Sequence, residues 1–262
     1  MNIETKSVAS EKALELKVRY YRWFPPEKHL GYAEENIILN MAKTALLLVD
    51  IYCGGPEKNI LDGIVGDKHT QLWYSITVNH IAPVLRAARE INLPVIYVNN
   101  SAPRIGLENS EFAEKLKKSL GFDMTVDFRE HMVDPREYHQ GPPSQLQFPS
   151  SVEPQATDYF IRKQCYSGFF ETRLDTLLRN LHIHNLICVG FVTDCCLFST
   201  ISDAVFRNYK VILLRDCTLA CELPSEVEDM KQTKRMILWI ETILGVSCTS
   251  EVFINACQKV PK

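Results

Sequence analysis

The sequence of 262 residues lacks several features that mark particular classes of protein. It has no apolar run near the roughly 18 residues that a membrane-spanning helix needs. Its first residues, "MNIETKSVASEK", hold no apolar stretch of the kind found in a secretory signal. It also lacks an excess of charge, because the net charge is only −3, so electrostatics does not favour nucleic acid or an anionic membrane as a partner. These absences predict a cytoplasmic globular protein.

Cysteine, by contrast, is abundant: the chain has nine. The number is odd and the spacing is irregular, so we expect free thiols in a reducing compartment and no disulfide framework. Cys217 and Cys221, in "DCTLAC", have a spacing that could suit zinc, but no second pair stands at a suitable distance. We therefore expect neither a metal nor a cofactor.

Apolar runs alternate with amphipathic helical patterns along most of the chain. The first run, "TALLLVD", is almost wholly apolar, which is typical of a strand buried on both faces. The predicted strands are 44–50, 93–100, 158–163, 185–190 and 210–216, and the predicted helices are 77–92, 172–181, 197–208 and 224–245. This alternation predicts an α/β fold, a Rossmann-like arrangement of three layers in which helices cover both faces of a parallel sheet.

Two segments lie outside this pattern. Residues 1–43 contain "RYYRWFPPEKHLGY" and are predicted to be an arm that wraps the domain or a partner subunit. The domain itself is predicted to span 44–262. Within it, 101–157 combines an amphipathic piece around 110–120 with the turn-rich "GPPSQLQFPSSVEP". A long excursion between two strands is usually a lid or a binding loop.

Reactive side chains follow three of the predicted strands. Asp50 ends the first strand, Lys163 ends the third, and Cys195 and Cys196 follow the fourth across a short turn. Each has an ordinary explanation by itself: a capping carboxylate, a lysine that reaches solvent, or an inert buried thiol. Parallel sheets, however, bind ligands at the carboxyl ends of their strands. A carboxylate, an ammonium and a thiol on that one rim therefore favour catalysis.

The start of the helix after "GFVTD" strengthens this interpretation. Thr193 or Asp194 is a suitable N-cap, which would place both thiols in the first helical turn. The helix dipole stabilises a thiolate there. The unpaired N–H groups of the same turn can also bind an oxyanion. An amide hydrolase needs this combination.

The segments "KQCYSGFFETRLD" and "VGFVTDCCL" resemble the isochorismatase-like cysteine hydrolases. The resemblance runs from about residue 44 to the C-terminus and implies that family's fold. Its motif Gly-x-x-Thr-Asp-x-Cys, counted from Gly190, implies that Cys196 is the nucleophile and that Cys195 occupies a variable position. It implies Asp50 and Lys163 as the other catalytic residues. It also implies a cis peptide between Val192 and Thr193, with the N–H groups of Val192 and Cys196 as the oxyanion hole.

Within the family, "YSGFF-x-T-x-LD-x-x-LR" is most similar to the ureidoacrylate, biuret and triuret amidohydrolases. This similarity implies hydrolysis of a C–N bond in a small linear amide or ureide through a thioester, without a cofactor. We expect a homo-oligomer. The chain reads Asp50-Ile51-Tyr52 where the family often has Asp-x-Gln, so the pocket wall differs. Candidate substrate contacts are Tyr52, Asn99 and Tyr166, although each is equally well explained by packing.

Other activities remain open at this stage. Metal-dependent relatives that hydrolyse nicotinamide carry Asp-x-His, whereas here the second strand ends "VNNSAP". We expect most of the scattered histidines to face solvent or to cap helices: His69, His80, His131, His139, His182 and His184. The chain could also be a non-catalytic relative that binds a metabolite or a protein, or a redox protein that uses Cys195 and Cys196. In the lid segment, Arg104, Arg129, Arg136 and His131 are candidates for recognising a substrate carboxylate, because arginine binds a carboxylate with two parallel hydrogen bonds.

Overall fold

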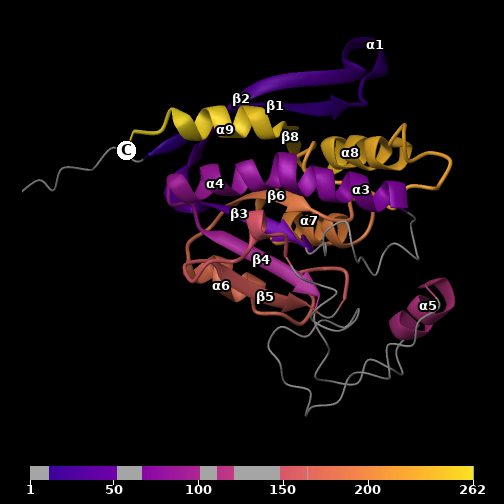
Figure 1. Ribbon diagram of the computed structural model, residues 1–262. Helices are drawn as coiled ribbons and strands as arrows, with labels where there is room; N and C mark the ends of the chain where they lie inside the picture. Colours follow the sequence, from indigo (N-terminus) through magenta and orange to yellow (C-terminus); the bar gives the residue numbers. More distant parts are fainter. Residues whose placement is uncertain (1–11, 52–66, 101–110, 121–147, 164, 262) are drawn as a thin grey trace, which may run out of the picture.

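One sheet of eight strands forms the centre of the molecule (Figure 1). The computed structural model describes residues 12–51, 67–100, 111–120, 148–163 and 165–261. The strand order is β2-β1-β8-β7-β6-β3-β4-β5. The six strands from β8 to β5 in that order are parallel, and β1 and β2 add an antiparallel hairpin at one edge. The strands are β1 (Ala13–Arg22), β2 (Gly31–Asn40), β3 (Thr44–Val49), β4 (Val95–Asn100), β5 (Tyr159–Lys163), β6 (Asn185–Gly190), β7 (Lys210–Leu214) and β8 (Val246–Cys248).

Helices cover both faces of the sheet, as the alternation of strands and helices predicts. One face packs against α3, α4 and α9, and the other packs against α6, α7 and α8. The helices are α1 (Pro26–His29), α3 (Asp67–Ile76), α4 (Ala82–Glu90), α5 (Glu111–Leu120), α6 (Leu174–Asn180), α7 (Cys196–Phe206), α8 (Lys231–Ile243) and α9 (Ser250–Gln258), with short turns η1 (Met41–Lys43), η2 (Thr77–Ile81) and η4 (Ser150–Val152). The predicted fold class is confirmed.

The central strand β3 shows why the sequence folds in this way. All six of its residues are buried. Alternate side chains enter opposite cores: Leu46 and Leu48 belong to the core under α3, α4 and α9, whereas Ala45 and Leu47 belong to the other. Each fully buried leucine contributes about 1.5–3 kcal/mol to folding. A strand that is covered on both faces therefore needs the near-continuous apolar run that the sequence has.

The predicted arm is a β-hairpin joined to the sheet. Strand β1 pairs with β2 along its whole length and meets β8 at Arg19 and Ser247. Arg19 Nε donates a hydrogen bond to Glu241 Oε1 of α8 at 2.7 Å, and the Glu241 side chain is fully buried. Residues 13–40 therefore extend the domain's own sheet. The wrapping of a partner subunit and the boundary at residue 44 stay predictions.

The C-terminal part differs from the prediction. The final predicted helix, 224–245, begins only at Lys231, because the Glu222 side chain accepts hydrogen bonds from the N–H groups of Gln232 and Thr233 at 2.9 and 2.7 Å. The carboxylate of Glu222 thus accepts hydrogen bonds from backbone N–H groups in the first turn of α8, which a local N-cap residue would otherwise accept. Strand β8 and helix α9 were not predicted. The helix predicted from residue 77 is also preceded by α3, which was not predicted.

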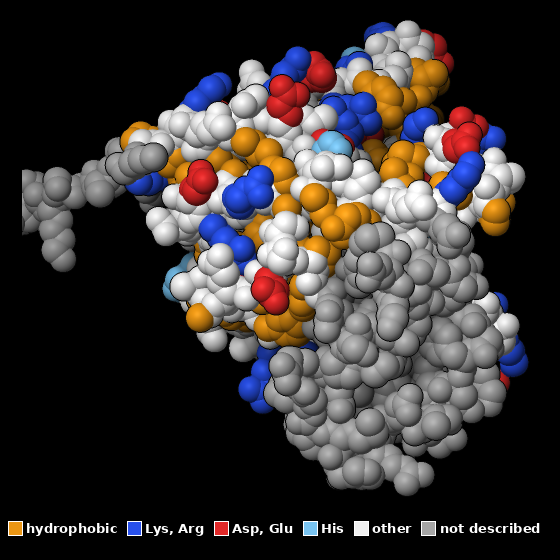
Figure 2. All heavy atoms as spheres, viewed as in Figure 1, with side chains coloured by type: hydrophobic (Ala, Val, Ile, Leu, Met, Phe, Trp, Pro, Cys, Tyr) orange, Lys and Arg blue, Asp and Glu red, His pale blue; other side chains and the backbone are white. Residues whose placement is uncertain are grey.

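The surface shows no preference for one sign of charge in the view of Figure 2. Lysine, arginine and acidic side chains are interspersed over the described part of that face, with apolar side chains between them. Among the described helices, none combines the length and apolar character needed to cross a membrane.

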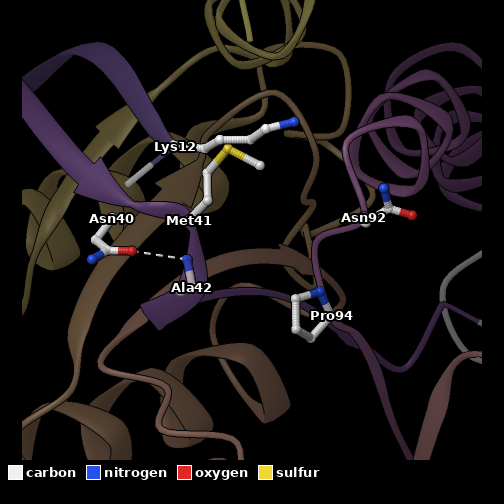
Figure 3. A pocket seen from close by; sticks show the side chains of 6 residues that line it. All are labelled: Lys12, Asn40, Met41, Ala42, Asn92 and Pro94. Atoms are coloured by element: carbon white, nitrogen blue, oxygen red, sulfur yellow. Dashed lines mark hydrogen bonds between the residues drawn. The ribbon is translucent and has the colours of Figure 1, made fainter. Parts of the chain in front are cut away.

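A pocket of about 390 Å³ lies at the amino ends of the parallel strands (Figure 3). Its lining residues are Lys12, Asn40, Met41, Ala42, Asn92 and Pro94. Asn40 and Ala42 come just before β3, and Pro94 comes just before β4. The pocket is therefore at the opposite end of the sheet from Asp50 and Lys163.

Candidate active site

The candidate site lies at the carboxyl ends of β3, β4 and β5. Asp50 follows β3, Asn100 ends β4 and Lys163 ends β5. Lys163 Nζ lies 2.7 Å from Asp50 Oδ2 and also donates to Asn100 Oδ1. The Asn100 backbone N–H donates to Asp50 Oδ1 at 2.9 Å. Because neighbouring parallel strands end on one rim, the fold alone brings the three residues together.

Both members of this ion pair are buried. The Lys163 side chain is fully buried and the Asp50 side chain is 4% exposed. Burial lowers the pKa of Lys163, but the Asp50 carboxylate and the Cys196 sulfur, which both attract the ammonium and hydrogen-bond to it, raise the pKa above its usual value overall. Lys163 therefore stays charged at neutral pH. The buried cation is thus in contact with both the carboxylate of Asp50 and the sulfur of Cys196.

Asn100 was not predicted as part of the site. It holds both members of the ion pair, through its side-chain oxygen and its backbone N–H. The only signal in the sequence is its place as the second asparagine of "VNN", at the end of a predicted strand. The register of β4 against β5, which pairs Asn100 with Lys163, decides its role.

Cys196 is the first residue of α7, after a turn that leaves β6. Gly190 begins the turn with φ of +120°, and the peptide bond between Phe191 and Val192 is cis. The Phe191 N–H donates to the Val49 carbonyl at 2.8 Å, which ties the turn to the end of β3. The turn therefore places Cys196 over the same rim as Asp50.

Two details of this turn correct the predictions. The cis peptide lies between Phe191 and Val192, one bond earlier than expected. Neither Thr193 nor Asp194 caps the helix; the N-cap position is Cys195, which makes no side-chain capping bond. The hydroxyl of Thr193 hydrogen-bonds to that of Thr218, and Asp194 Oδ1 accepts from the Cys221 N–H. Both polar side chains therefore bind the loop after β7, at Thr218 and Cys221. This loop is distant in the sequence, so the local pattern does not show it.

The backbone of the turn offers two donors at the thiol. Within the described residues, the N–H groups of Val192 and Cys196 have no acceptor, whereas those of Thr193, Cys195 and Leu197 are bonded to backbone carbonyls. Unpaired donors at the start of a helix of eleven residues suit a developing negative charge. These are the two N–H groups that the sequence predicts for an oxyanion hole.

The neighbouring thiols differ from Cys196. The pKa of Cys195 is raised, first because its thiol hydrogen-bonds to Cys196 and then because it is buried. Burial raises the pKa of Cys221 to about 12, helped by the nearby Asp194 and Cys196. Both side chains therefore stay as neutral thiols at neutral pH. Cys195 can donate its S–H toward the Cys196 sulfur.

The three predicted substrate contacts fall in different places. Tyr52 lies outside the described residues. Asn99 is fully buried, and neither of its side-chain amide atoms has a hydrogen-bond partner among the residues that the structure describes. Tyr166 is 37% exposed, and its pKa is raised by burial and by the adjacent Cys195, to which it hydrogen-bonds. A buried amide without a partner is rare, and a ligand is one way to satisfy it.

We expect activity to survive exhaustive treatment with a chelator, because no group of three or more His, Cys, Asp or Glu side chains in the described part of the chain could hold a metal ion. Cys217 and Cys221, the pair with a spacing that could suit zinc, belong to no such group among the described residues. Ammonia release before and after dialysis against EDTA checks this prediction. A loss of activity that added zinc or iron restores would contradict it.

We expect Gly190→Ala to destabilise the protein by about 4 kcal/mol or more, which is diagnostic of a severe local clash. An added Cβ would lie 2.0 Å from the Val49 carbonyl oxygen, and φ of +120° disfavours any L side chain. Gly31→Ala is the matched control, because Gly31 has the same φ but open space around it. Chemical denaturation of both variants measures the difference. Equal losses would show that the approach to Val49 is unimportant.

A protein family model matches most of the chain. Residues 63–243 match the family model described as "Isochorismatase domain". That range includes Lys163 and Cys196, and Asp50 precedes it. A ureidoacrylate amidohydrolase, RutB, of Yersinia enterocolitica is 39% identical over 104 residues, which are 40% of this chain and 43% of that protein. The aligned part thus spans less than half of this relative.

Solved structures share the fold. A cysteine hydrolase from Pseudomonas syringae superposes with a TM-score of 0.62 at 24% identity, covering 84% of this chain and 94% of its own. N-carbamoylsarcosine amidase from Thermoplasma acidophilum superposes with a TM-score of 0.52 at 23% identity, covering 80% of this chain and 97% of its own. At these identities the likeness shows a common fold.

Proposed function

The chain belongs to the isochorismatase family, and we propose that it is a cysteine-dependent hydrolase that cleaves a C–N amide bond of a small linear amide or ureide. One observation carries the proposal. The buried ion pair of Asp50 and Lys163 lies beside Cys196, at the start of a helix that has free N–H groups. These are the base, the cation and the nucleophile that amide hydrolysis through a thioester requires.

In the first step, Asp50 accepts the thiol proton of Cys196. Lys163 holds the resulting thiolate by opposite charge, and the start of α7 adds the positive end of the helix dipole. The thiolate attacks the carbonyl carbon and forms a C–S bond. The carbonyl electron pair moves to oxygen, which accepts hydrogen bonds from the N–H groups of Val192 and Cys196.

The tetrahedral species collapses when Asp50 gives its proton to the leaving nitrogen and the C–N bond breaks. Ammonia or an amine departs, and the acyl group remains on Cys196 as a thioester. Asp50, again ionised, removes a proton from a water molecule that attacks the thioester. The second tetrahedral species releases the carboxylic or carbamic acid and the Cys196 thiolate, which takes up the proton held by Asp50. No redox reagent enters the balance.

Two relatives suggest the substrate class. They are a ureidoacrylate amidohydrolase and an N-carbamoylsarcosine amidase, and both are named for compounds that contain a ureido group. Asn99, next to Asn100 at the end of β4 and without a side-chain partner among the described residues, stays a candidate contact for this group. Tyr166, which is 37% exposed and hydrogen-bonds to Cys195, is a candidate contact for the remainder of the substrate.

We expect acidic ureides to be preferred over neutral ones such as biuret. The predicted lid holds Arg104, Arg129, Arg136 and His131, which lie outside the described residues. Alanine at one of these arginines should raise KM for an acidic ureide by about tenfold, which corresponds to about 1.4 kcal/mol of lost binding. Steady-state kinetics on paired acidic and neutral ureides measures the effect. If acidic and neutral substrates respond equally in all three arginine variants, the lid does not recognise charge.

The test of the proposed function is ammonia release from a panel that contains ureidoacrylate, an N-carbamoyl amino acid, biuret and nicotinamide. Turnover of a ureide by the wild type, but not by Cys196→Ala, supports the proposal. Turnover of nicotinamide alone would favour the nicotinamidase alternative. Binding without turnover of any compound would favour a non-catalytic relative. A reversible thiol oxidation without hydrolysis would favour a redox protein.

A further inference from the structure

The turn of residues 190–194, which carries the proposed oxyanion donor Val192, is hydrogen-bonded to the loop of residues 217–221 after β7. Four hydrogen bonds join the two segments: Gly190 N to Cys217 O at 3.0 Å, Thr193 N to Leu219 O at 3.0 Å, Thr193 Oγ1 with Thr218 Oγ1 at 2.6 Å, and Cys221 N to Asp194 Oδ1 at 3.1 Å. The position of the turn therefore depends on the position of residues 217–221. These residues belong to no helix or strand, so their own conformation must be fixed by other contacts.

Ala220 is the point at which that loop is held. It is fully buried, and both of its backbone polar groups bond to side chains of helices. Its N–H donates to Thr233 Oγ1 of α8 at 2.9 Å, and its carbonyl lies 2.7 Å from His69 Nε2 of α3. One helix from each face of the sheet thus holds the same residue.

His69 departs from the expectation that most histidines face solvent or cap helices. Its side chain is fully buried, and Nδ1 has no hydrogen-bond partner in the described part of the chain. A carbonyl oxygen can only accept, so Nε2 carries the proton that is donated to Ala220. His69 therefore donates through Nε2, and its one side-chain hydrogen bond among the described residues is the bond to the loop.

The same helix also contacts the turn directly. Trp73 lies one helical turn after His69, and its ring packs against Phe191 with centroids 4.4 Å apart. The two rings of α3 are themselves in edge contact at 6.0 Å. Helix α3 thus contacts the turn through the ring of Phe191, the residue before Val192. It also binds the loop of residues 217–221 through His69. Both contacts constrain the backbone that carries the unpaired N–H group of Val192.

We propose that His69 is a positioning residue for the oxyanion hole, acting through Ala220 and Leu219 on the turn that contains Val192. The inference rests on the proposed function, because it assumes that these N–H groups stabilise an oxyanion. The alternative role for His69 is structural: the ring fills space in the core and donates a hydrogen bond to the Ala220 carbonyl, without any effect on the oxyanion hole. The two differ in which reactions of Cys196 they affect.

Two reactions of the same thiol separate these cases. Alkylation by iodoacetamide displaces iodide at a saturated carbon and forms no oxyanion, so it needs the thiolate but not the Val192 N–H. Addition of Cys196 to propionaldehyde forms a hemithioacetal through an oxyanion, and its extent is measured as protection against alkylation. The experiment compares His69→Leu, His69→Gln and the matched surface control His184→Leu with the wild type.

For His69→Leu we expect kcat to fall about 10- to 100-fold with KM nearly unchanged, a smaller loss than the removal of an oxyanion donor itself causes. Aldehyde protection should weaken in parallel, while the alkylation rate stays within about twofold because the Asp50–Lys163 pair is intact. In His69→Gln the side-chain amide can reach the Ala220 carbonyl, so both kcat and aldehyde protection should return to near their wild-type values. His184 is exposed and lies at the amino end of β6, so its variant should match the wild type.

Several results would overturn the proposal. A parallel fall in alkylation and aldehyde protection would mean general damage to the site. Unchanged kcat and protection in His69→Leu would mean a packing role alone, and a failure of His69→Gln to restore either would mean that the hydrogen bond is unimportant. If His69→Leu does not fold, His69→Met, which also removes the donor to the Ala220 carbonyl, takes its place in the comparison with His69→Gln. If the wild type hydrolyses no ureide, the proposed function fails, and aldehyde protection still tests the role of His69.

Discussion

Replacing Cys196 by alanine should leave a folded protein whose hydrolysis of the preferred ureide is reduced about 10⁴-fold or more, as is typical when a covalent nucleophile is removed. The reason is chemical. Cys196 is the thiol that contacts the buried ammonium of Lys163 and begins α7 beside two unpaired N–H groups. No other described thiol combines these contacts. The measurement is steady-state ammonia release, with circular dichroism to verify the fold.

Cys195→Ala is the matched control, because the two cysteines are adjacent and have the same volume. The pKa of the Cys195 thiol is raised by its hydrogen bond to Cys196 and by burial, so Cys195 stays a neutral hydrogen-bond donor at neutral pH. We expect its loss to reduce kcat by about tenfold, the lower end of the scale of one hydrogen bond to a charged group. An inactive Cys195→Ala beside an active Cys196→Ala would show that the register of the motif was misread.

Asp50→Asn should reduce kcat by about 10²- to 10⁴-fold, the range attributed to general acid–base catalysis. Asparagine has the same shape and tolerates the left-handed backbone of Asp50, whose φ is +48°. The substitution therefore removes the base and the counter-charge of Lys163 without a new steric conflict. Because it leaves a buried ammonium without its carboxylate, we also expect a stability loss of about 3–5 kcal/mol. Kinetics and chemical denaturation measure the two effects.

A double variant separates stability from chemistry. Asp50→Asn combined with Lys163→Met removes both charges, so it should recover much of the lost stability while it stays inactive. Lys68→Met is the surface control, because the ion pair of Lys68 with Glu228 is exposed and should be dispensable. If Asp50→Asn kept wild-type kcat, Asp50 would not be the proton acceptor, whatever its effect on stability.

The catalytic rim was predictable because it depends on strand ends. The apolar runs that lead to Asp50, Lys163 and Gly190 fix where the parallel strands stop, and the sheet then brings those ends together. The structure places Asp50 and Lys163 in contact, as this reasoning anticipates. Their catalytic roles, and that of Cys196, remain predictions.

The remaining features of the site depend on tertiary contacts. Asn100 joins the ion pair through the register of two strands, which the sequence does not state. The caps expected at Thr193 and Asp194 fail because both side chains bond to the loop at 218–221 instead. His69 is an exception to the expectation that most histidines face solvent or cap helices, and its partner, Ala220, is 151 residues away. The residue pattern within one segment does not indicate which distant residues its side chains will contact.

The most direct test of Cys196 as the nucleophile is a rapid-quench experiment on the wild type with its preferred ureide, followed by digestion and peptide mass spectrometry. We expect an acyl adduct on the peptide that contains Cys195 and Cys196, with fragmentation placing it on Cys196, and with a yield that rises and falls as turnover proceeds. Cys195→Ala should give the same adduct, and Cys196→Ala should give none. An adduct on Cys195, or full turnover by Cys196→Ala, would contradict hydrolysis through a thioester on Cys196.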